Sequence, residues 1–135
     1  MADKLHFELV SPERLLMSAD VDMVVVPGVE GDFGVLINHA PVVSTLRTGI
    51  LEVHNGEVPE QLLVRGGFAE VNPDGLTVLA EEAMLLSQVD RAALEAELKD
   101  ANEDLADASD DDHLAAATKV RDRLVEILGV LDLAA

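Results

Sequence analysis

The spacing of apolar residues changes abruptly near Asp90, and this change constrains the fold more than any other feature of the sequence. Before Asp90, apolar and polar residues alternate in short runs interrupted by turn residues, which indicates β-strands. After it, apolar residues recur every three or four positions, the spacing of one helix face. We therefore predict an α+β protein with two domains: an N-terminal all-β sandwich over residues 1–88 and a C-terminal antiparallel two-helix hairpin over residues 89–135.

Several strands and turns of the first domain can be predicted individually. Leu5–Val10 alternates between apolar and polar residues, as a half-buried strand does. Val21–Val26 ends apolar on both faces, which is typical of a central strand. Asn55-Gly56 favours a type I′ hairpin turn, because both residues tolerate positive φ. Asn72-Pro73-Asp74-Gly75 predicts a second hairpin turn.

Two apolar seams predict the helices of the second domain. Asp90 is a suitable N-cap for the first helix, and Asp110–Asp112 complement the dipole of the second. Gly129 is expected to end or weaken the second helix. The short connection between the helices requires them to be antiparallel. The first seam consists of Leu94, Leu98, Ala101, Leu105 and Ala108, and the second of Ala117, Val120, Leu124, Ile127 and Leu131.

Composition excludes several classes of function. The chain has 9 basic and 27 acidic residues, a net charge of -18, which argues against nucleic acid or an anionic membrane surface as the partner. It has no cysteine, so disulfides and thiol chemistry are excluded. The N-terminus has no basic and apolar leader, so we expect no export. The longest uncharged stretch, Phe33–Leu46, is shorter than the ~20 apolar residues of a membrane-spanning helix.

Pro27–Pro41 concentrates the residues with special backbone preferences. Pro27 is expected to end the preceding strand because it cannot donate to a sheet ladder. Gly28, Gly31 and Gly34 recur at every third position, which favours a tight, irregular loop. A phosphate-binding loop is disfavoured, because no Lys-Ser/Thr follows and acidic residues flank the glycines.

This segment also resembles part of a known family. Together with Thr45–Gly49, Arg65–Val71 and Thr77–Ala83, it is similar to the epsilon subunit of bacterial F-type ATP synthases. The resemblance is tightest over Leu5–Ala83. It implies a non-catalytic rotor subunit of a proton-translocating complex, with the gamma subunit and the c ring as partners, and the catalytic head subunits when the hairpin extends. It implies no cofactor, no direct membrane insertion, and a peripheral position on the cytoplasmic face of the inner (plasma) membrane.

The resemblance also suggests two partner-contact residues. In the family this loop faces the ring of membrane-embedded c subunits, and the acidic and histidine positions near that contact match Asp32 and His39 here. The residues alone favour a different interpretation of His39, as a loop histidine in an Asn-His-Ala-Pro turn with its hydrogen bonds satisfied locally, and leave a partner contact as the alternative.

Other sites are disfavoured by the pattern of residues. The four histidines, His6, His39, His54 and His113, lie in separate segments without a close-spaced ligand pair, so no metal site is predicted. Ser44 near His39 lacks a nucleophile elbow and an orienting acid, which disfavours a small hydrolase.

Some family members bind ATP through an Asp-x-x-Arg-Ala motif in the hairpin. Asp90 matches its first position, but Ala93 and Leu94 occupy the Arg-Ala positions, so the motif is degenerate and no nucleotide-binding residue is predicted. The second helix offers few cations among its acids, so we expect any regulation of ATP hydrolysis by the hairpin to be weak. A free-standing nucleotide-sensing regulatory module remains the alternative function.

Overall fold

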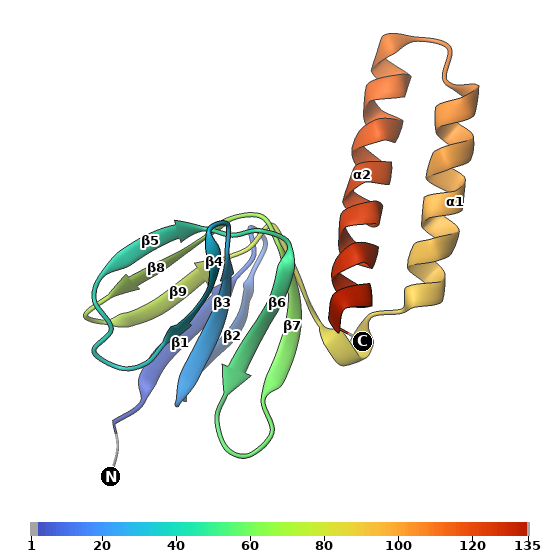
Figure 1. Cartoon of the computed structure of the whole chain (residues 1–135). Helices are drawn as coiled ribbons and strands as arrows, with labels where there is room; N and C mark the ends of the chain where they lie inside the picture. Colours follow the sequence, from blue (N-terminus) through green and yellow to red (C-terminus); the bar gives the residue numbers. More distant parts are fainter. Residues whose placement is uncertain (1–2, 135) are drawn as a thin grey trace. The chain divides into compact units, whose positions relative to one another are not determined.

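A computed structural model describes residues 3–134 of the chain. It divides into two compact units, Met1–Gln88 and Val89–Ala135. The first contains all the described strands and the second contains two long helices (Figure 1). The predicted fold class is confirmed. No helix in the described part of the chain is both long and apolar enough to cross a membrane.

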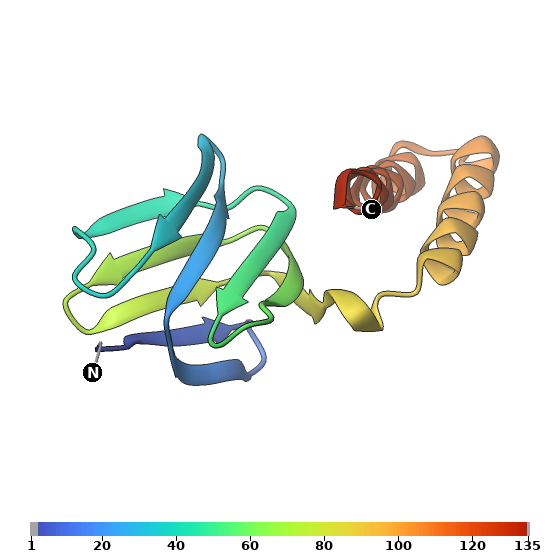
Figure 2. The same cartoon turned by 60° about the horizontal axis from the view of Figure 1, so that its bottom comes forward.

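The first unit is a sandwich of two five-stranded sheets (Figure 2). One sheet has the order β2-β1-β9-β8-β5 and the other β10-β7-β6-β3-β4. Only the β1–β9 pair is parallel; the other described pairs are antiparallel. The strands are β1 Leu5–Val10, β2 Leu15–Val21, β3 Met23–Gly28, β4 Gly31–Val35, β5 Val42–Thr45, β6 Gly49–His54, β7 Glu60–Arg65, β8 Phe68–Asn72, β9 Gly75–Leu79 and β10 Glu82–Leu85, followed by the 3-10 helix η1 Leu86–Gln88.

The core between the sheets is almost entirely aliphatic. Leu5, Phe7 and Leu9 of β1 point inward and are buried, while His6 and Glu8 between them are not, as the alternation predicts. Each fully buried large side chain contributes roughly 1.5–3 kcal/mol, so this set of contacts supplies most of the favourable energy of folding. The buried core residues are Leu5, Phe7, Leu9, Val21, Val24, Val26, Val35, Leu46, Leu51, Val53, Leu62, Val64, Ala69, Val71, Leu76, Val78 and Ala80.

The predicted loop over Pro27–Pro41 is wrong in its first half, which is a β-hairpin. Strand β3 continues through Pro27 to Gly28, and Pro27 pairs with Asp32 on β4. The Pro27 carbonyl accepts a hydrogen bond from the Arg47 backbone N–H (3.0 Å), on the side away from β4. The N–H and C=O of one strand residue point to the same side of the strand. The N–H that Pro27 lacks would therefore point away from β4, so its absence removes no hydrogen bond from the β3–β4 ladder.

The two predicted hairpin turns have different outcomes. Asn72 pairs with Gly75, so the β8–β9 turn is confirmed. The type I′ turn at Asn55-Gly56 is wrong, because the β6–β7 ladder ends at the pair Val53–Glu60 and leaves a longer loop. Polar contacts hold this loop instead: Asn55 Oδ1 accepts from Lys4 Nζ (2.8 Å) and the Gly56 N–H donates to Asp22 (3.2 Å).

The second unit is the predicted antiparallel hairpin of α1 Arg91–Asp107 and α2 Asp111–Ala134. The Asp90 carboxylate caps α1 by accepting from the Ala93 N–H (3.1 Å), as predicted. Asp110 caps α2 in the same way through the His113 N–H (2.8 Å). This backbone bond, with the His113 side chain, holds the pKa of Asp110 below its ordinary value.

The helix seams are formed mainly at the end of the hairpin away from its turn. Leu124, Ile127 and Leu128 are buried there, whereas the predicted seam residue Val120 is 46% exposed. The predicted stop at Gly129 is wrong: α2 continues to Ala134, and Gly129 is an exposed helical residue without positive φ. Glycine inside a helix costs only about 1 kcal/mol relative to alanine, which the flanking apolar contacts offset.

We propose that residues 1–88 form an independent domain, because the core residues of the sandwich all lie within that range. A chain of residues 1–88 is expected to unfold in one cooperative transition with a melting temperature close to that of the sandwich in the full chain. Circular dichroism at a β-sheet wavelength measures this. A fragment without a cooperative transition would contradict the proposed domain boundary.

Candidate functional site

Asp32 lies next to the β3–β4 turn, where it forms an ion pair with Arg47. Both side chains are about half exposed. Arg47 belongs to the segment between β5 and β6, which crosses from one sheet to the other. The Asp32 carboxylate therefore ties this crossing segment to the β3–β4 hairpin, while one side of the ion pair remains accessible to a partner.

The crossing segment is also held by backbone hydrogen bonds. The Val29 N–H donates to Thr45 and the Leu46 N–H donates to Gly67, each at 3.0 Å. Gly28 and Gly49 permit the close approach, because a Cβ on Gly28 would lie 2.9 Å from the Gly31 carbonyl oxygen, and one on Gly49 would lie 2.7 Å from Arg47. The end of the sandwich that carries Asp32 is therefore tightly connected.

His39 lies beyond the opposite end of β4. Its N–H donates to the Leu36 carbonyl (3.2 Å), Asn38 takes a left-handed conformation (φ 66°), and the ring Nδ1 lies 2.7 Å from the Ala40 carbonyl oxygen. The half-buried ring thus has a local partner, and Leu36 and Ile37 beside it are exposed. The turn presents an apolar surface together with the histidine.

The structure does not bring Asp32 and His39 together. Strand β4 separates them, and no hydrogen bond or ion pair among the described residues joins them. Ser44 is also not linked to His39 in this part of the chain, because its hydroxyl donates to the Thr45 carbonyl (3.2 Å). A partner that contacts both candidate residues must cover the whole length of the β3–β4 hairpin.

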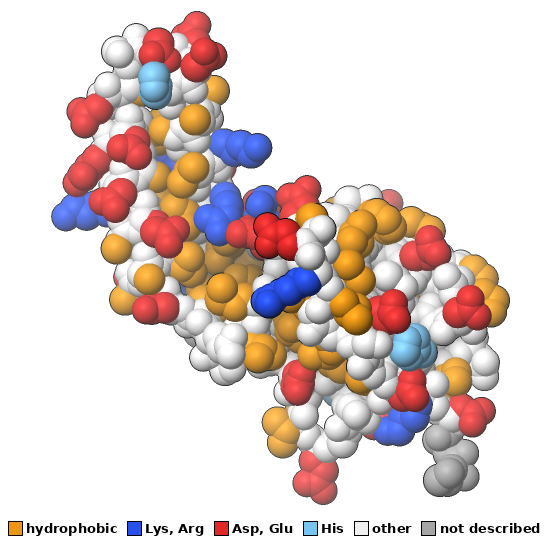
Figure 3. Space-filling view, turned by 180° about the vertical axis from the view of Figure 1, so that it is seen from behind, with side chains coloured by type: hydrophobic (Ala, Val, Ile, Leu, Met, Phe, Trp, Pro, Cys, Tyr) orange, Lys and Arg blue, Asp and Glu red, His pale blue; other side chains and the backbone are white. Residues whose placement is uncertain are grey.

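An apolar row, which the local sequence pattern does not predict, crosses the outer face of the β2-β1-β9-β8-β5 sheet. The register pairs Leu15 with Val10, Val10 with Leu79, and Leu79 with Phe68. Val10, Leu79 and Phe68 each stand next to a buried core residue of the same strand and so face outward. Leu15 shares this face because it pairs with Val10 beyond a β-bulge. Leu15 is 55% and Phe68 41% exposed. Hydrophobic side chains gather on the sandwich in the view from behind (Figure 3). The signal in the sequence was an apolar residue at outward positions of four strands, but it becomes a row only once the register is known.

Acidic residues lie beside this apolar row on the same face. His6 hydrogen-bonds Asp20 through Nδ1 (3.0 Å) and Glu8 through Nε2 (3.2 Å), and these bonds raise the pKa of the imidazole. The two carboxylates bind opposite ring nitrogens and so cannot converge on one ion. No group of three or more possible ligands among the described residues is placed to hold a metal.

Two arginines of the hairpin that could contact a nucleotide phosphate are paired with carboxylates. Arg91 contacts Glu95 and Asp132, which joins the start of α1 to the end of α2, and these carboxylates raise its pKa. Arg121 contacts Asp122 at 2.8 Å. Asp90, the one residue of the ATP motif that is present, is the N-cap of α1. A triphosphate would have to displace these carboxylates before it could contact Arg91 or Arg121.

Comparison with known proteins gives consistent matches. The family model of the beta-sandwich domain of the ATP synthase delta/epsilon chain matches residues 4–86. The ATP synthase epsilon chain of Parvibaculum lavamentivorans is 56% identical over 128 residues, covering 94% of this chain and 97% of that protein. The epsilon chain of Rhodospirillum centenum is 50% identical over 141 residues, covering 100% of this chain and 94% of that protein.

A solved structure also matches nearly the whole chain. It is a chain of the Euglena gracilis mitochondrial ATP synthase, determined by cryo-electron microscopy as an assembly of OSCP, F1 and the c ring. The match has a TM-score of 0.75 and 27% sequence identity, and it covers 99% of this chain and 82% of that chain.

The pairing of Arg91 and Arg121 predicts that the hairpin binds ATP no more tightly than roughly millimolar, about -4 kcal/mol. Isothermal titration calorimetry of the full chain with ATP measures this. Substituting Glu95 and Asp132 with Gln and Asn releases Arg91 and is expected to strengthen binding relative to the wild-type chain. Micromolar affinity of the wild-type chain would contradict the prediction.

Proposed function

The chain belongs to the ATP synthase epsilon-chain family, and we propose that its β-sandwich joins the gamma subunit to the c ring through two separate surfaces. It is a non-catalytic subunit of the rotor stalk of ATP synthase. Such a subunit transmits torque through adhesion and shape. The observation that carries the proposal is the apolar row across the outer face of the β2-β1-β9-β8-β5 sheet.

The apolar row suits a permanent contact with the gamma subunit. A single exposed leucine is ordinary on a protein surface, but four apolar positions in register across adjacent strands form a continuous patch. The side chains stand on a sheet whose other face is the core, so the patch is rigid before binding and loses little entropy on association. Cores of lasting interfaces are apolar in this way.

We assign the c ring to the β3–β4 hairpin and its flanking turn, which carry Asp32 and His39. This assignment rests on the accessible side of the Asp32–Arg47 ion pair and on the exposed Leu36 and Ile37 beside His39. Contact with the ring would hold the chain on the cytoplasmic face of the membrane. The membrane contact is therefore made through the complex.

The hairpin would act at most as a weak brake on ATP hydrolysis when it extends toward the catalytic head. Residues 89–135 contain 13 acidic and 5 basic side chains. A domain with a negative field is not drawn into an acidic cavity, because like charges raise the energy of insertion. Replacing the full chain with residues 1–88 is therefore expected to change steady-state ATP hydrolysis of the complex less than about twofold.

A charge placed in the apolar row tests the contact with the gamma subunit. The double variant L15D/F68D is expected to bind the gamma subunit at least tenfold more weakly, because each substitution would bury an unpaired carboxylate in the interface. The affinity is measured as binding of each variant to surface-immobilised gamma subunit. Thermal melting establishes that the variants fold. V58D makes the same change in the β6–β7 loop, where Val58 is 82% exposed, and should bind normally. Equal binding by L15D/F68D and V58D would contradict the assignment.

A charge swap tests the contact of Asp32 with the ring. If Asp32 serves only the fold, D32R/R47D preserves the ion pair and coupling should be normal. If Asp32 also contacts the ring, D32R/R47D and D32A should both reduce ATP-driven proton pumping while ATP hydrolysis by the detached head is unchanged. H39A reports on the other end of β4 in the same assay. Normal pumping in both D32A and H39A would contradict the assignment of these residues to the ring.

A further inference from the structure

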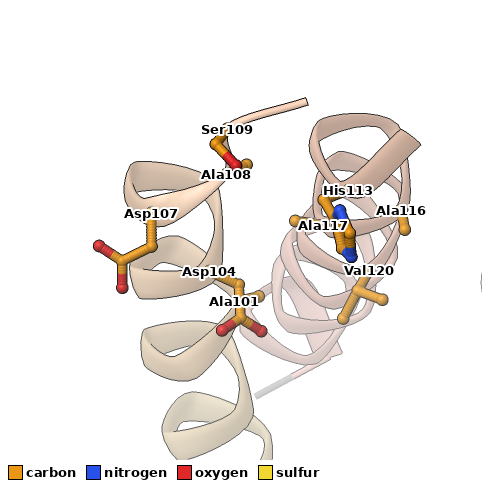
Figure 4. A pocket seen from close by; sticks show the side chains of 9 residues that line it. All are labelled: Ala101, Asp104, Asp107, Ala108, Ser109, His113, Ala116, Ala117 and Val120. Atoms are coloured by element: carbon orange, nitrogen blue, oxygen red, sulfur yellow. The ribbon is translucent and has the colours of Figure 1, made fainter. Parts of the chain in front are cut away.

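The helical hairpin has an open hollow between α1 and α2 next to its turn (Figure 4). The hollow has a volume of about 580 Å³. Its walls are formed largely by small side chains from both helices and from the residues that follow α1. The lining consists of Ala101, Asp104, Asp107, Ala108, Ser109, His113, Ala116, Ala117 and Val120.

The hollow follows from the distribution of side-chain size along the two helices. At the end away from the turn, Leu124, Ile127 and Leu128 fill the space between the helices and are buried. Next to the turn, the facing residues are alanines, with Ala101 the only lining residue that is buried. Val120 lines the hollow and is 46% exposed. The hairpin therefore leaves an apolar surface that its own residues do not fill.

The surroundings of the hollow are strongly acidic. From Asp100 through Thr118, with both ends counted, the chain has seven carboxylates and no Lys or Arg. Asp104 and Asp107 are among the lining residues, and Figure 4 shows the Asp104 carboxylate facing the opening between the helices, while the Asp107 carboxylate is directed away from α2. Acidic side chains also crowd the turn end of the hairpin in Figure 3. His113, which also lines the hollow, is in contact with the Asp110 carboxylate.

We propose that this hollow, with its alanine walls and its Asp104–Asp107 rim, is a docking site for a basic amphipathic segment of another protein. Lysine and arginine side chains suit both the apolar walls and the acidic rim of the hollow. Their aliphatic stems can cover Ala101 and Val120, while their charged ends reach the carboxylates at the rim. The net charge of -18 disfavours a second copy of this chain as the occupant, and it opposes anionic ligands. The proposal is independent of the surfaces assigned to the gamma subunit and the c ring.

The experiment uses the full chain and a labelled synthetic peptide of Leu and Lys at the spacing of an amphipathic helix. A second peptide has Glu in place of every Lys. Fluorescence anisotropy at about 0.15 M salt limits unspecific attraction between distant charges, because the screening length is then about 8 Å. The Lys peptide is expected to bind saturably with one site and the Glu peptide to give no binding.

Three variants separate the hollow from general acidity. D104N/D107N is expected to weaken binding at least tenfold. E30Q/E57Q removes the same charge from exposed positions of the sandwich and should change the affinity less than about twofold. A117L keeps every charge but fills the hollow from the side of α2 that faces α1 (Figure 4), and it should also weaken binding at least tenfold. Equal weakening in D104N/D107N and E30Q/E57Q, or unchanged binding by A117L, would overturn the proposal, as would an absence of saturable binding to the wild-type chain.

Discussion

Cross-strand register in the β2-β1-β9-β8-β5 sheet determines both the core of the sandwich and its outer surface. Because side chains alternate between the two faces of a strand, each buried residue places its neighbours outward. Phe7 and Leu9 in the core therefore commit His6, Glu8 and Val10 to the outer face. A slip of one residue would exchange the two faces, so the large cost of exposing the core also holds the apolar row in place. The core contacts that stabilise the fold thus also fix the position of the apolar row, which is the proposed partner surface.

The parallel pairing of β1 with β9 has a similar consequence. It brings Val10 beside Leu79, two residues that are far apart in the sequence. Without this pair, the apolar row would be two separate patches, one on the β1–β2 hairpin and one on the β8–β9 hairpin. Antiparallel hairpins form from local contacts, but the parallel contact requires the whole unit to fold. The continuous outer patch is thus a property of the complete sandwich.

The strands and helices could be predicted from the sequence because local rules determine them, whereas the surfaces could not. The alternation in Leu5–Val10 and the cap at Asp90 are local, and the structure reproduces them. Pro27 was misjudged because its effect depends on which neighbour its missing N–H faces, which is a tertiary property. Gly129 was misjudged for a related reason, since its modest cost is outweighed by the flanking buried residues Leu124, Ile127 and Leu128.

The positions of the candidate site residues also could not be predicted from local sequence patterns. Asp32 and His39 are seven positions apart, and a single loop would have placed them together, but the hairpin separates them along β4. The pairing of Asp32 with Arg47 depends on the crossing of the chain between the sheets, which local patterns do not reveal.

The two units of the chain are both acidic, but they present different kinds of surface to a partner. Residues 1–88 carry 14 acidic and 4 basic side chains, but the apolar row gives the sandwich an adhesive surface that does not depend on charge. In the hairpin, the large apolar side chains are concentrated away from the turn, and the turn end combines alanines with seven carboxylates. Apolar adhesion is insensitive to salt, whereas contacts of the hairpin are screened within about 8 Å at physiological ionic strength. The sandwich is therefore suited to permanent attachment in a rotor that must not slip, and the hairpin to contacts that form and break.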